Sequence, residues 1–130
     1  MSFGARVADL VLGPRIPPAE RPCALPDGVE VRRNGWIPRI GGWFMGSRRP
    51  AGGVTLGRTI VVPEGAEPTE SLLVHELVHV EQWRDPLFPL KYCAQWVRRG
   101  YRGNPYEIEA YRRQREHAAR IPNDRTPRPP

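Results

Sequence analysis

The sequence is poor in lysine, in cysteine and in long apolar runs. Lys91 is the only lysine among 20 basic residues, so arginine carries nearly all of the basic charge behind the net charge of +6. The two cysteines, Cys23 and Cys93, form no Cys-x-x-Cys pair and have no spacing typical of metal ligands, which argues against a cysteine-based metal site. We expect two free thiols in a reducing cytoplasm, with a disulfide that pins the N-terminal arm as the alternative.

The apolar stretch near the N-terminus, residues 7–12, is interrupted by Asp9 and followed by Pro14. It is too short and too broken for a secretory signal core or a membrane span. We therefore expect a soluble, cytoplasmic protein. The basic surplus would attract acidic partners, including an anionic membrane surface in peripheral contact or an acidic peptide, or it would serve only to keep the surface solvated. We expect no specific nucleic-acid partner.

A chain of 130 residues fits one domain of modest core size, and its 16 prolines and 13 glycines place much of it in turns and tails. Residues 1–28 are predicted to be a proline-rich arm laid over the body, with no more than a turn or two of helix near residues 6–12. Residues 29–121 are predicted to form the single domain. Residues 122–130 cannot bury apolar surface and are predicted to be a disordered tail.

Short β-prone runs separated by glycine-containing breaks fill residues 29–62, at 29–32, 36–40, 43–45, 54–56 and 59–62. They predict a small, mostly antiparallel sheet. Three helices follow, at 70–83 after the N-cap Thr69, at 87–101 after Pro86, and at 105–120 after the N-cap Asn104. The first of these is apolar on nearly every side, which indicates that other elements enclose it. The sequence thus predicts an α+β fold with the 70–83 helix at its centre.

One segment of this central helix calls for a chemical explanation. His75-Glu76-Leu77-Val78-His79 matches His-Glu-x-x-His within an apolar run. Residues four apart share a face of an α-helix, so His75 and His79 can bind one tetrahedral zinc ion. Glu76 lies one position round the helix, where its carboxylate can accept a proton from a water at the open metal position. A third protein ligand must come from elsewhere.

Glu107 is the third ligand that the sequence favours. Glu107 and Glu109 are about 200° apart on a helix, so only one of them can face inward. Glu107 shares its face with Ala110, a small residue that lets two helices approach closely. The other acidic or histidine side chains downstream lie too close to His79 along the chain, late in the last helix or in the tail: Glu81, Asp85, Glu116, His117 and Asp124.

A structural role for Glu107 is the alternative. Asn104-Pro105-Tyr106-Glu107 puts it at the third position of the last helix, where a capping-box glutamate bonds back to the N-cap amide. The His-Glu-x-x-His pattern favours the ligand role, because that pair needs a third ligand. The sequence therefore predicts one Zn²⁺ per chain, bound by His75, His79 and Glu107.

The His-Glu-x-x-His segment, followed by Glu107-Ile108-Glu109-Ala110, resembles the gluzincin metallopeptidases, whose third zinc ligand is a glutamate on a later helix. Residues 57–63 and 72–82 are also similar to short bacterial zincin-like domains, including the core domain associated with extracellular contractile injection systems. The resemblance covers about residues 54–111. It implies a minimal zincin fold in which an edge strand at 59–62 lines the cleft. Several gluzincins have Asp where this chain has Tyr111, so the hydrogen-bond partner of a zinc histidine is left unassigned.

Taken together, the residues predict a zinc-dependent metalloendopeptidase that acts on a peptide or protein substrate, with Glu76 as general base. Tyr111 is the candidate donor to the developing oxyanion, with Tyr101 and Tyr106 as further candidates and simple packing as the alternative for each. Two other interpretations compete. One is a catalytically silent zinc-binding module for protein interaction or assembly, and the other is a basic nucleic-acid or membrane binder in which the motif is accidental.

Overall fold

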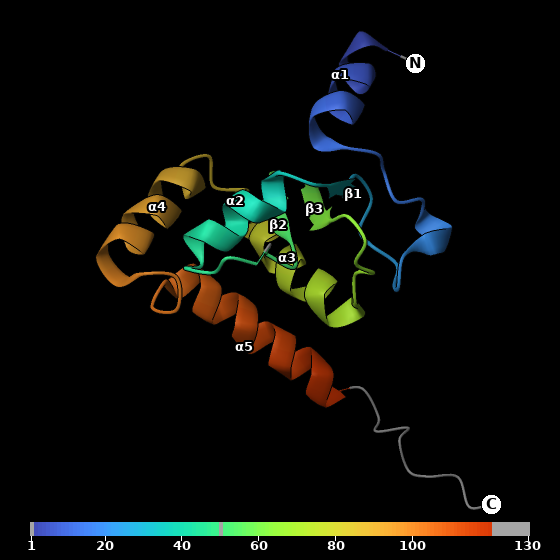
Figure 1. Cartoon of the computed structure of the whole chain (residues 1–130). Helices are drawn as coiled ribbons and strands as arrows, with labels where there is room; N and C mark the ends of the chain where they lie inside the picture. The colour runs from blue at the N-terminus through green and yellow to red at the C-terminus, as the bar shows by residue number, and fades with distance from the viewer. Residues whose placement is uncertain (1, 50, 121–130) are drawn as a thin grey trace, which may run out of the picture.

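Three strands and five α-helices make up an α+β fold in the part of the chain that the computed structural model describes, residues 2–49 and 51–120 (Figure 1). No helix in these ranges is long and apolar enough to cross a membrane. Cys23 and Cys93 are free thiols, as predicted. The predicted tail, 122–130, lies outside the described residues.

In chain order the elements are α1 (Phe3–Leu12), a 3-10 turn (Pro18–Glu20), β1 (Glu30–Asn34), α2 (Ile37–Phe44), β2 (Val54–Leu56), β3 (Thr59–Pro63), α3 (Glu70–Gln82), α4 (Phe88–Arg99) and α5 (Pro105–Arg120).

The sheet is mixed, in the order β1-β3-β2. β1 and β3 are parallel, in register from Glu30 opposite Thr59 to Asn34 opposite Pro63, whereas β2 pairs antiparallel with β3 across a two-residue turn. The strands predicted at 54–56 and 59–62 are confirmed, but the prediction of a mostly antiparallel sheet is wrong. β1 and β3 run parallel because the chain between them crosses over through α2 and β2 instead of turning back in a hairpin.

The residues after β1 form helix α2 where the sequence predicted strands at 36–40 and 43–45. Asn34 starts this helix, since its side-chain oxygen accepts hydrogen bonds from the N–H groups of Trp36 at 2.8 Å and Ile37 at 2.9 Å. Gly42, which we expected in a turn, allows a close contact instead. A Cβ on Gly42 would lie 2.0 Å from the carbonyl oxygen of Arg49. A cap and a backbone contact therefore decide this segment, against the β propensity of its aromatic residues.

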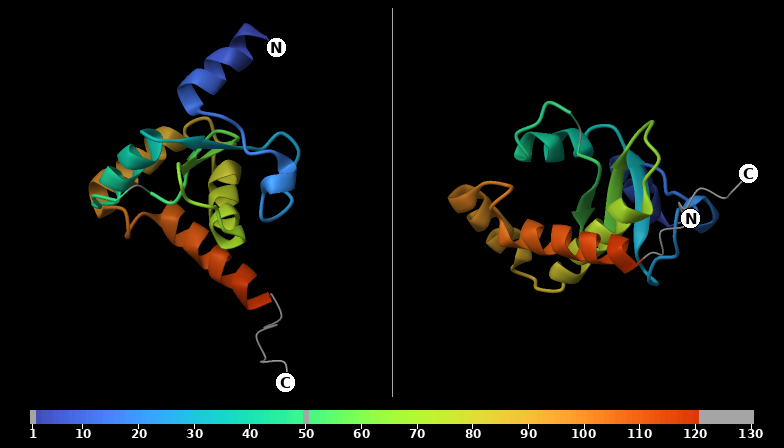
Figure 2. Two further views of the ribbon diagram at one scale, coloured as in Figure 1. Left: turned by 45° about the vertical axis from the view of Figure 1, so that its right-hand side comes forward. Right: turned by 90° about the horizontal axis from the view of Figure 1, so that it is seen from below.

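Helix α3 lies between the sheet and α5 (Figure 2). Thr69 caps it, with its hydroxyl oxygen accepting from the N–H of Leu72 at 3.1 Å. Leu73 of α3 joins the main core, which also contains Ile16, Val29, Val31, Ile60 and Val62. The predicted helices at 70–83, 87–101 and 105–120 are confirmed to within two residues at each end, whereas α2 was not predicted and α1 is longer than the turn or two that was predicted.

Helix α1 projects from the body, and none of its residues is buried (Figures 1 and 2). The prediction of no more than a turn or two of helix here is wrong, because no proline interrupts the segment before Pro14. Arg32 of β1 holds the end of α1: its guanidinium, with 1% exposure, donates to Asp9 at 2.7 Å and to the carbonyl oxygen of Gly13 at 2.8 Å. The arm lies over the body only after α1, where Ile16 enters the core.

Replacing Gly42 by alanine should destabilise the protein. The added Cβ would meet the Arg49 carbonyl oxygen at 2.0 Å, so α2 or the following loop must shift. We expect the free energy of unfolding to fall by about 1–3 kcal/mol, as in overpacked cores. Gly4→Ala is the matched control in a helix, because a Cβ there meets nothing within 4 Å and alanine is the better helix former. Urea unfolding followed by circular dichroism measures both, and equal stabilities would contradict the packing assigned to α2.

Candidate metal centre

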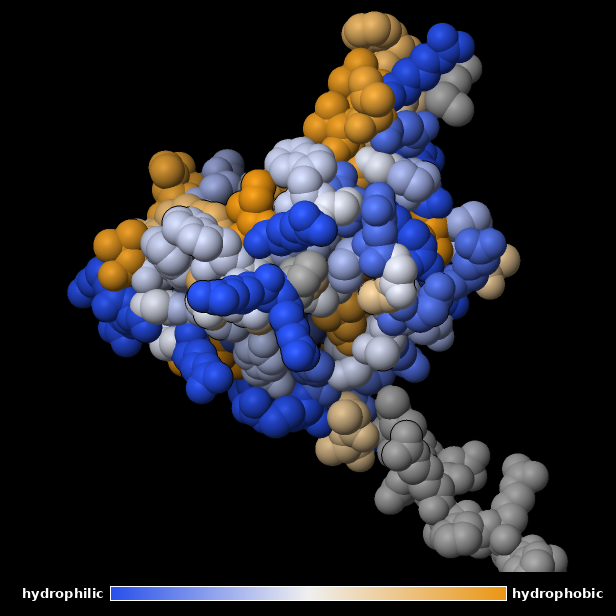
Figure 3. All heavy atoms as spheres, in the orientation of Figure 1, coloured by the Kyte–Doolittle hydropathy of each residue, from blue (hydrophilic) through white to orange (hydrophobic). Residues whose placement is uncertain are grey.

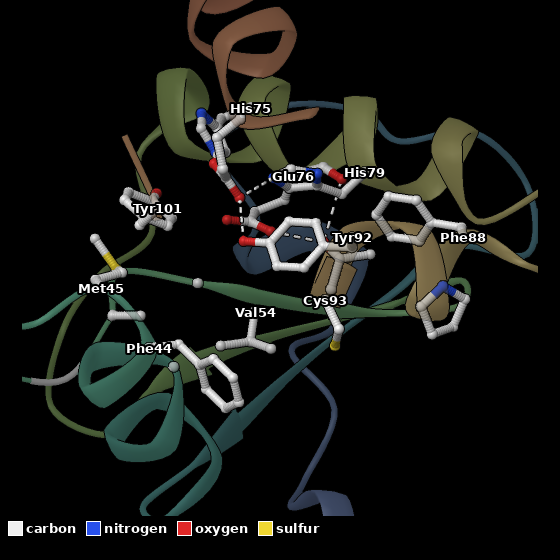
Figure 4. Close-up of a pocket in the computed structure, with 16 residues that line it drawn as sticks. Phe44, Met45, Val54, His75, Glu76, His79, Phe88, Tyr92, Cys93 and Tyr101 are labelled. Atoms are coloured by element: carbon white, nitrogen blue, oxygen red, sulfur yellow. Dashed lines mark hydrogen bonds and ion pairs between the residues drawn. The ribbon is translucent and has the colours of Figure 1, made fainter. Parts of the chain in front are cut away.

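His75 and His79 on α3 and Glu107 on α5 lie together, and all three are buried. His75 Nε2 is 3.1 Å from Glu107 Oε2, and His79 Nε2 is 3.0 Å from Glu107 Oε1. One possible ligand atom from each residue lies within 4.8 Å of the others. Figure 4 shows the two imidazoles and Glu76 along one wall of a pocket. The structure therefore brings together the three residues that the sequence selected as zinc ligands.

The start of α5 explains how Glu107 reaches the histidines. The buried Asn104 caps the helix, with its side-chain oxygen accepting from the N–H of Tyr106 at 3.1 Å and its amide nitrogen donating to the carbonyl oxygen of Tyr92 at 3.2 Å. Ala110, one turn further, has 0% exposure and leaves room for α3. The capping-box alternative for Glu107 is wrong, because the Asn104 N–H donates to Tyr101 while the Glu107 carboxylate faces the imidazoles.

Two glutamines orient the imidazoles. Gln114 Oε1 lies 3.0 Å from His75 Nδ1, and Gln82 Oε1 lies 2.7 Å from His79 Nδ1. Their amide nitrogens donate elsewhere, to Ser71 at 2.7 Å and to the carbonyl oxygen of Tyr106 at 3.1 Å, which leaves the amide oxygens to face the rings. Each Nδ1 is thus placed to carry the proton, and each Nε2 keeps a lone pair, as metal-binding histidines require.

The sequence did not single out these glutamines as site residues. Gln82 is three residues after His79 on α3, and Gln114 is seven residues after Glu107 on α5. Both spacings return to the face of the helix that carries the ligand, so helical periodicity was the signal that could have found them. Tyr111, where several gluzincins have Asp, packs its ring against His75 with the ring centroids 4.4 Å apart. The amide groups therefore supply the contacts that the sequence left unassigned.

These groups fit a metal ion. With protons on both Nδ1 atoms, the two Nε2 lone pairs face two carboxylate oxygens at 3.0–3.1 Å, and acceptors at this distance repel unless a cation or protons lie between them. Two neutral imidazoles and one carboxylate form a donor set that suits Zn²⁺ and leaves a fourth position for water.

When no metal is bound, protons lie between the imidazole Nε2 atoms and the Glu107 carboxylate. Burial alone would lower the pKa of His79, but the hydrogen bond and charge of Glu107 outweigh it and raise that pKa from 6.5 to about 9. Burial alone would raise the pKa of Glu107, but the hydrogen bonds from His75 and His79 hold it well below its usual range. A metal ion must therefore displace at least the His79 proton.

Glu76 lies beside this cluster and is buried, with 4% exposure. Burial raises the pKa of its carboxyl, against the lowering effects of the nearby His79 charge and of the Thr55 hydroxyl, which lies 2.6 Å from Glu76 Oε2. Gly53 makes room for the other oxygen: a Cβ on Gly53 would be 3.1 Å from Glu76 Oε1. The carboxylate that the sequence selected as a base therefore lies beside the proposed ligands, in a setting that favours its uptake of a proton.

A cavity of about 250 Å³ lies against Glu76 and the three candidate ligands. Its other walls are mainly apolar and come from α2, β2 and α4, as Figure 4 shows for Phe44, Met45, Val54 and Phe88. β2 is the edge strand beside this cavity, whereas β3 is the central strand of the sheet. The expectation that 59–62 would be the edge strand lining the cleft is therefore wrong.

The tyrosines are arranged differently from the expectation. Tyr111 does not line the cavity, but its hydroxyl lies 2.9 Å from that of Tyr101, which does. Tyr92, which the sequence did not single out as a site residue, also lines the cavity and donates from its hydroxyl to Glu107 Oε1 at 2.9 Å. Burial raises the pKa of both Tyr92 and Tyr101 far above the usual range, so both hydroxyls stay protonated. Tyr106 packs on Phe88 outside the cavity.

Four of the acidic or histidine side chains that the sequence did not favour as ligands have other partners. Glu81 pairs with Arg113, Asp85 with Lys91, and His117 lies 3.3 Å from Glu70. Glu109 Oε2 lies 3.4 Å from the amide nitrogen of Gln82. Asp124 lies outside the described residues. None of the described members of this group reaches the cluster of His75, His79 and Glu107.

Replacing His79 by alanine should abolish metal binding. It removes one of two imidazole ligands from a three-residue set, and the remaining pair cannot hold zinc in competition with a chelator. We expect about one zinc per purified wild-type chain and almost none in His79→Ala, as measured by elemental analysis after brief chelation. His117→Ala is the control, because His117 is the third histidine of the chain and lies at Glu70. Zinc retained by His79→Ala, or lost equally by both variants, would contradict the site.

The affinity for zinc should rise with pH. The pKa of His79 is about 9 without metal, so zinc displaces a proton below that pH, and we expect the association constant to grow about tenfold per pH unit up to it. The metal-free protein should show the opposite trend: its His79 stabilisation is complete below pH 6.5 and is lost as the pH rises through about 9. Titration calorimetry in buffers of different ionisation enthalpy, together with thermal unfolding, measures both. A pH-independent affinity would contradict proton displacement.

Comparisons of the chain with protein-family models, with curated proteins and with solved structures give no match. The candidate centre is therefore defined by its own geometry. The observations that define it are the three buried donors, the two glutamines that orient the imidazoles, and the carboxylate beside them.

Proposed function

We propose that this chain is a zinc-dependent peptide hydrolase of the gluzincin type. The observation that carries the proposal is the orientation of the two imidazoles, with each Nδ1 facing a glutamine oxygen and each Nε2 facing the Glu107 carboxylate. His75, His79 and Glu107 would hold the ion. A zinc ion bound there would polarise a peptide carbonyl and lower the pKa of a bound water to about 7.

Glu76 is the general base in this proposal. It follows His75 directly on α3 and lines the cavity, so its carboxylate is close to any water that enters beside the ligands. Its raised pKa brings proton uptake nearer to neutral pH, where a base is most effective. The Thr55 hydroxyl holds Oε2, and the absence of a side chain at Gly53 leaves room for Oε1. Glu76 then delivers the proton to the departing amine.

Tyr101 and Tyr92 are the hydroxyl donors that this proposal assigns to the cavity. Tyr101 takes the position of oxyanion donor that the sequence suggested for Tyr111, since it lines the cavity and its pKa keeps the proton in place. Tyr111, 2.9 Å from the Tyr101 hydroxyl, would position it. Tyr92 already donates to Glu107 and would orient that carboxylate toward the metal.

The proposed substrate is an extended peptide. β2 pairs with β3 along one edge, and its residues Val54 and Thr55 line the cavity, so a peptide can lie beside the strand while a side chain enters the space. Phe44, Met45 and Phe88 make that space suited to an apolar side chain.

A zinc-binding interaction module without catalysis is the second candidate. The observation that favours it is the 2.6 Å contact between Thr55 and Glu76, because a carboxylate oxygen held by a hydroxyl is a weaker proton acceptor. The two candidates share the metal and differ in what Glu76 does.

Replacing Glu76 by glutamine separates them. The peptide hydrolase should keep its zinc and lose at least about a hundredfold in the rate of cleavage of an unfolded protein, because the general base is gone. Glu116→Gln is the control: Glu116 is an exposed residue of α5 that lies outside the cavity. Cleavage is followed by mass spectrometry of the products, with zinc content measured on the same samples. Equal cleavage by the wild type and Glu76→Gln would contradict the proposal, and zinc binding with no cleavage by any of the three proteins would favour the module.

A further inference from the structure

Acidic residues are absent from both walls that enclose the cavity. Of the 14 Asp and Glu residues in the chain, none lies in residues 37–53, which hold α2 and the loop after it, or in residues 86–106, which hold α4 and the loop after it. Among the residues that the structure describes, the only carboxylates that line the cavity are those of Glu76 and Glu107 on its inner wall. The walls therefore carry positive charge alone.

Six arginines supply that charge. Each is exposed, and each lies one to three positions along the chain from a residue that lines the cavity. Within residues 2–49 and 51–120, none of them forms an ion pair, whereas Lys91 on α4 is paired with Asp85. Figure 3 shows hydrophilic side chains among pale and apolar ones on the face that carries α2, α4 and the start of α5. The six, named here the rim arginines, are Arg39, Arg48, Arg49, Arg98, Arg99 and Arg102.

The two walls that carry the rim arginines are joined to each other. Trp96 Nε1 on α4 donates to the carbonyl oxygen of Phe44 on α2 at 2.7 Å, and the rings of Phe44 and Trp96 pack edge to face with centroids 5.0 Å apart. The carbonyl oxygen of Arg49 packs against Gly42 of α2, and that of Arg99 packs against Gly103. These backbone contacts fix the points from which the side chains of Arg49 and Arg99 extend.

We infer that the site takes an acidic peptide segment, in which an apolar residue enters the cavity and Asp or Glu residues on either side of it meet the rim arginines. This inference rests on the proposed function for the site it uses, and it adds the class of substrate. Unpaired guanidinium groups bind carboxylates through paired N–H donors. Their summed field would also draw an acidic segment toward the opening and hold a basic one away.

The apolar walls argue against a nucleic acid as the occupant. The cavity is lined mainly by apolar groups, among them Phe44, Val54 and Phe88, and a phosphate that entered it would lose its hydration without enough donors to replace it. A peptide avoids this cost, because its neutral apolar side chain enters the cavity while its carboxylates stay at the rim. A concave cavity is likewise a poor fit for a flat bilayer surface.

The test uses the zinc-loaded Glu76→Gln protein, which should bind peptides without cutting them. Two labelled peptides share a central Ala-Phe-Leu and differ in their flanks, glutamate in one and lysine in the other. At low salt we expect the glutamate peptide to bind at least about tenfold more tightly, because several exposed ion pairs, each weak, act together. The difference should shrink in about 0.5 M salt, which screens exposed charges. Fluorescence anisotropy measures both affinities.

The second part of the test reverses the charge of the rim arginines. We replace four rim arginines by glutamate in two double variants, R48E/R49E and R98E/R99E. Each double variant should lose most of the preference for the glutamate peptide over the lysine peptide, while its zinc content stays at the wild-type value. R6E/R120E is the matched control, with the same change in net charge on exposed arginines of α1 and of the far end of α5. This control should keep the preference. Equal binding of the two peptides, or equal losses in the rim and control pairs, would overturn the inference.

Competition separates the other occupants. A single-stranded oligonucleotide or vesicles rich in phosphatidylserine that displace the glutamate peptide through the same arginines, at matched charge concentration, would overturn the choice of a peptide. A different result would show that the proposed hydrolase function fails. If the glutamate peptide binds through the rim arginines but the wild-type enzyme cuts neither peptide, the acidic-segment site stands and the hydrolase proposal fails.

Discussion

The meeting of three electron-pair donors in a buried space is the constraint on which the rest of the structure depends. The Nε2 atoms of His75 and His79 and the carboxylate of Glu107 approach to 3.0–3.1 Å, a distance that neutral imidazoles and an anion tolerate only around positive charge. The side-chain oxygens of Gln82 and Gln114 face the Nδ1 atoms and favour a proton there, so that the Nε2 lone pairs face the Glu107 carboxylate. Because five side chains on two helices cooperate in it, the arrangement suits a cation, and the His79 proton balances it when no metal is bound.

The same constraint determines how the helices pack. α5 must lie close enough to α3 for a glutamate side chain to reach both imidazoles, and the buried Ala110 permits that approach. The cap at Asn104 then sets where α5 begins, one turn before Glu107. β2 closes the other side of α3, with Thr55 bonded to Glu76 and Trp83 Nε1 donating to the carbonyl oxygen of Thr55 at 3.0 Å. Helix α3 is thus held on two sides by groups that also shape the cavity.

The helices that carry the centre were predictable because their signals are local. Thr69, Asn104 and the prolines at 86 and 105 mark the ends of α3, α4 and α5 within a few residues of sequence. The segment after β1 misled the prediction, because its aromatic residues and paired glycines have the composition of a hairpin. Its helical state depends on a contact of Gly42 with Arg49 and on the cap by Asn34. The parallel pairing of β1 with β3 joins residues about thirty positions apart, which no local pattern encodes.

The sequence by itself determined that His75 and His79 share a helix face, that Glu76 follows beside them, and that Glu107 is the acidic residue best placed to meet them. These statements need only the helical period and the position of the caps. Tertiary structure decided the rest: which nitrogen of each ring faces the centre, that Tyr101 and Tyr92 line the cavity while Tyr111 does not, and that β2 is the edge strand beside it. The reason is physical, since a ring orientation or a cavity wall is set by side chains from elements far apart in the chain, which meet only when the chain is folded.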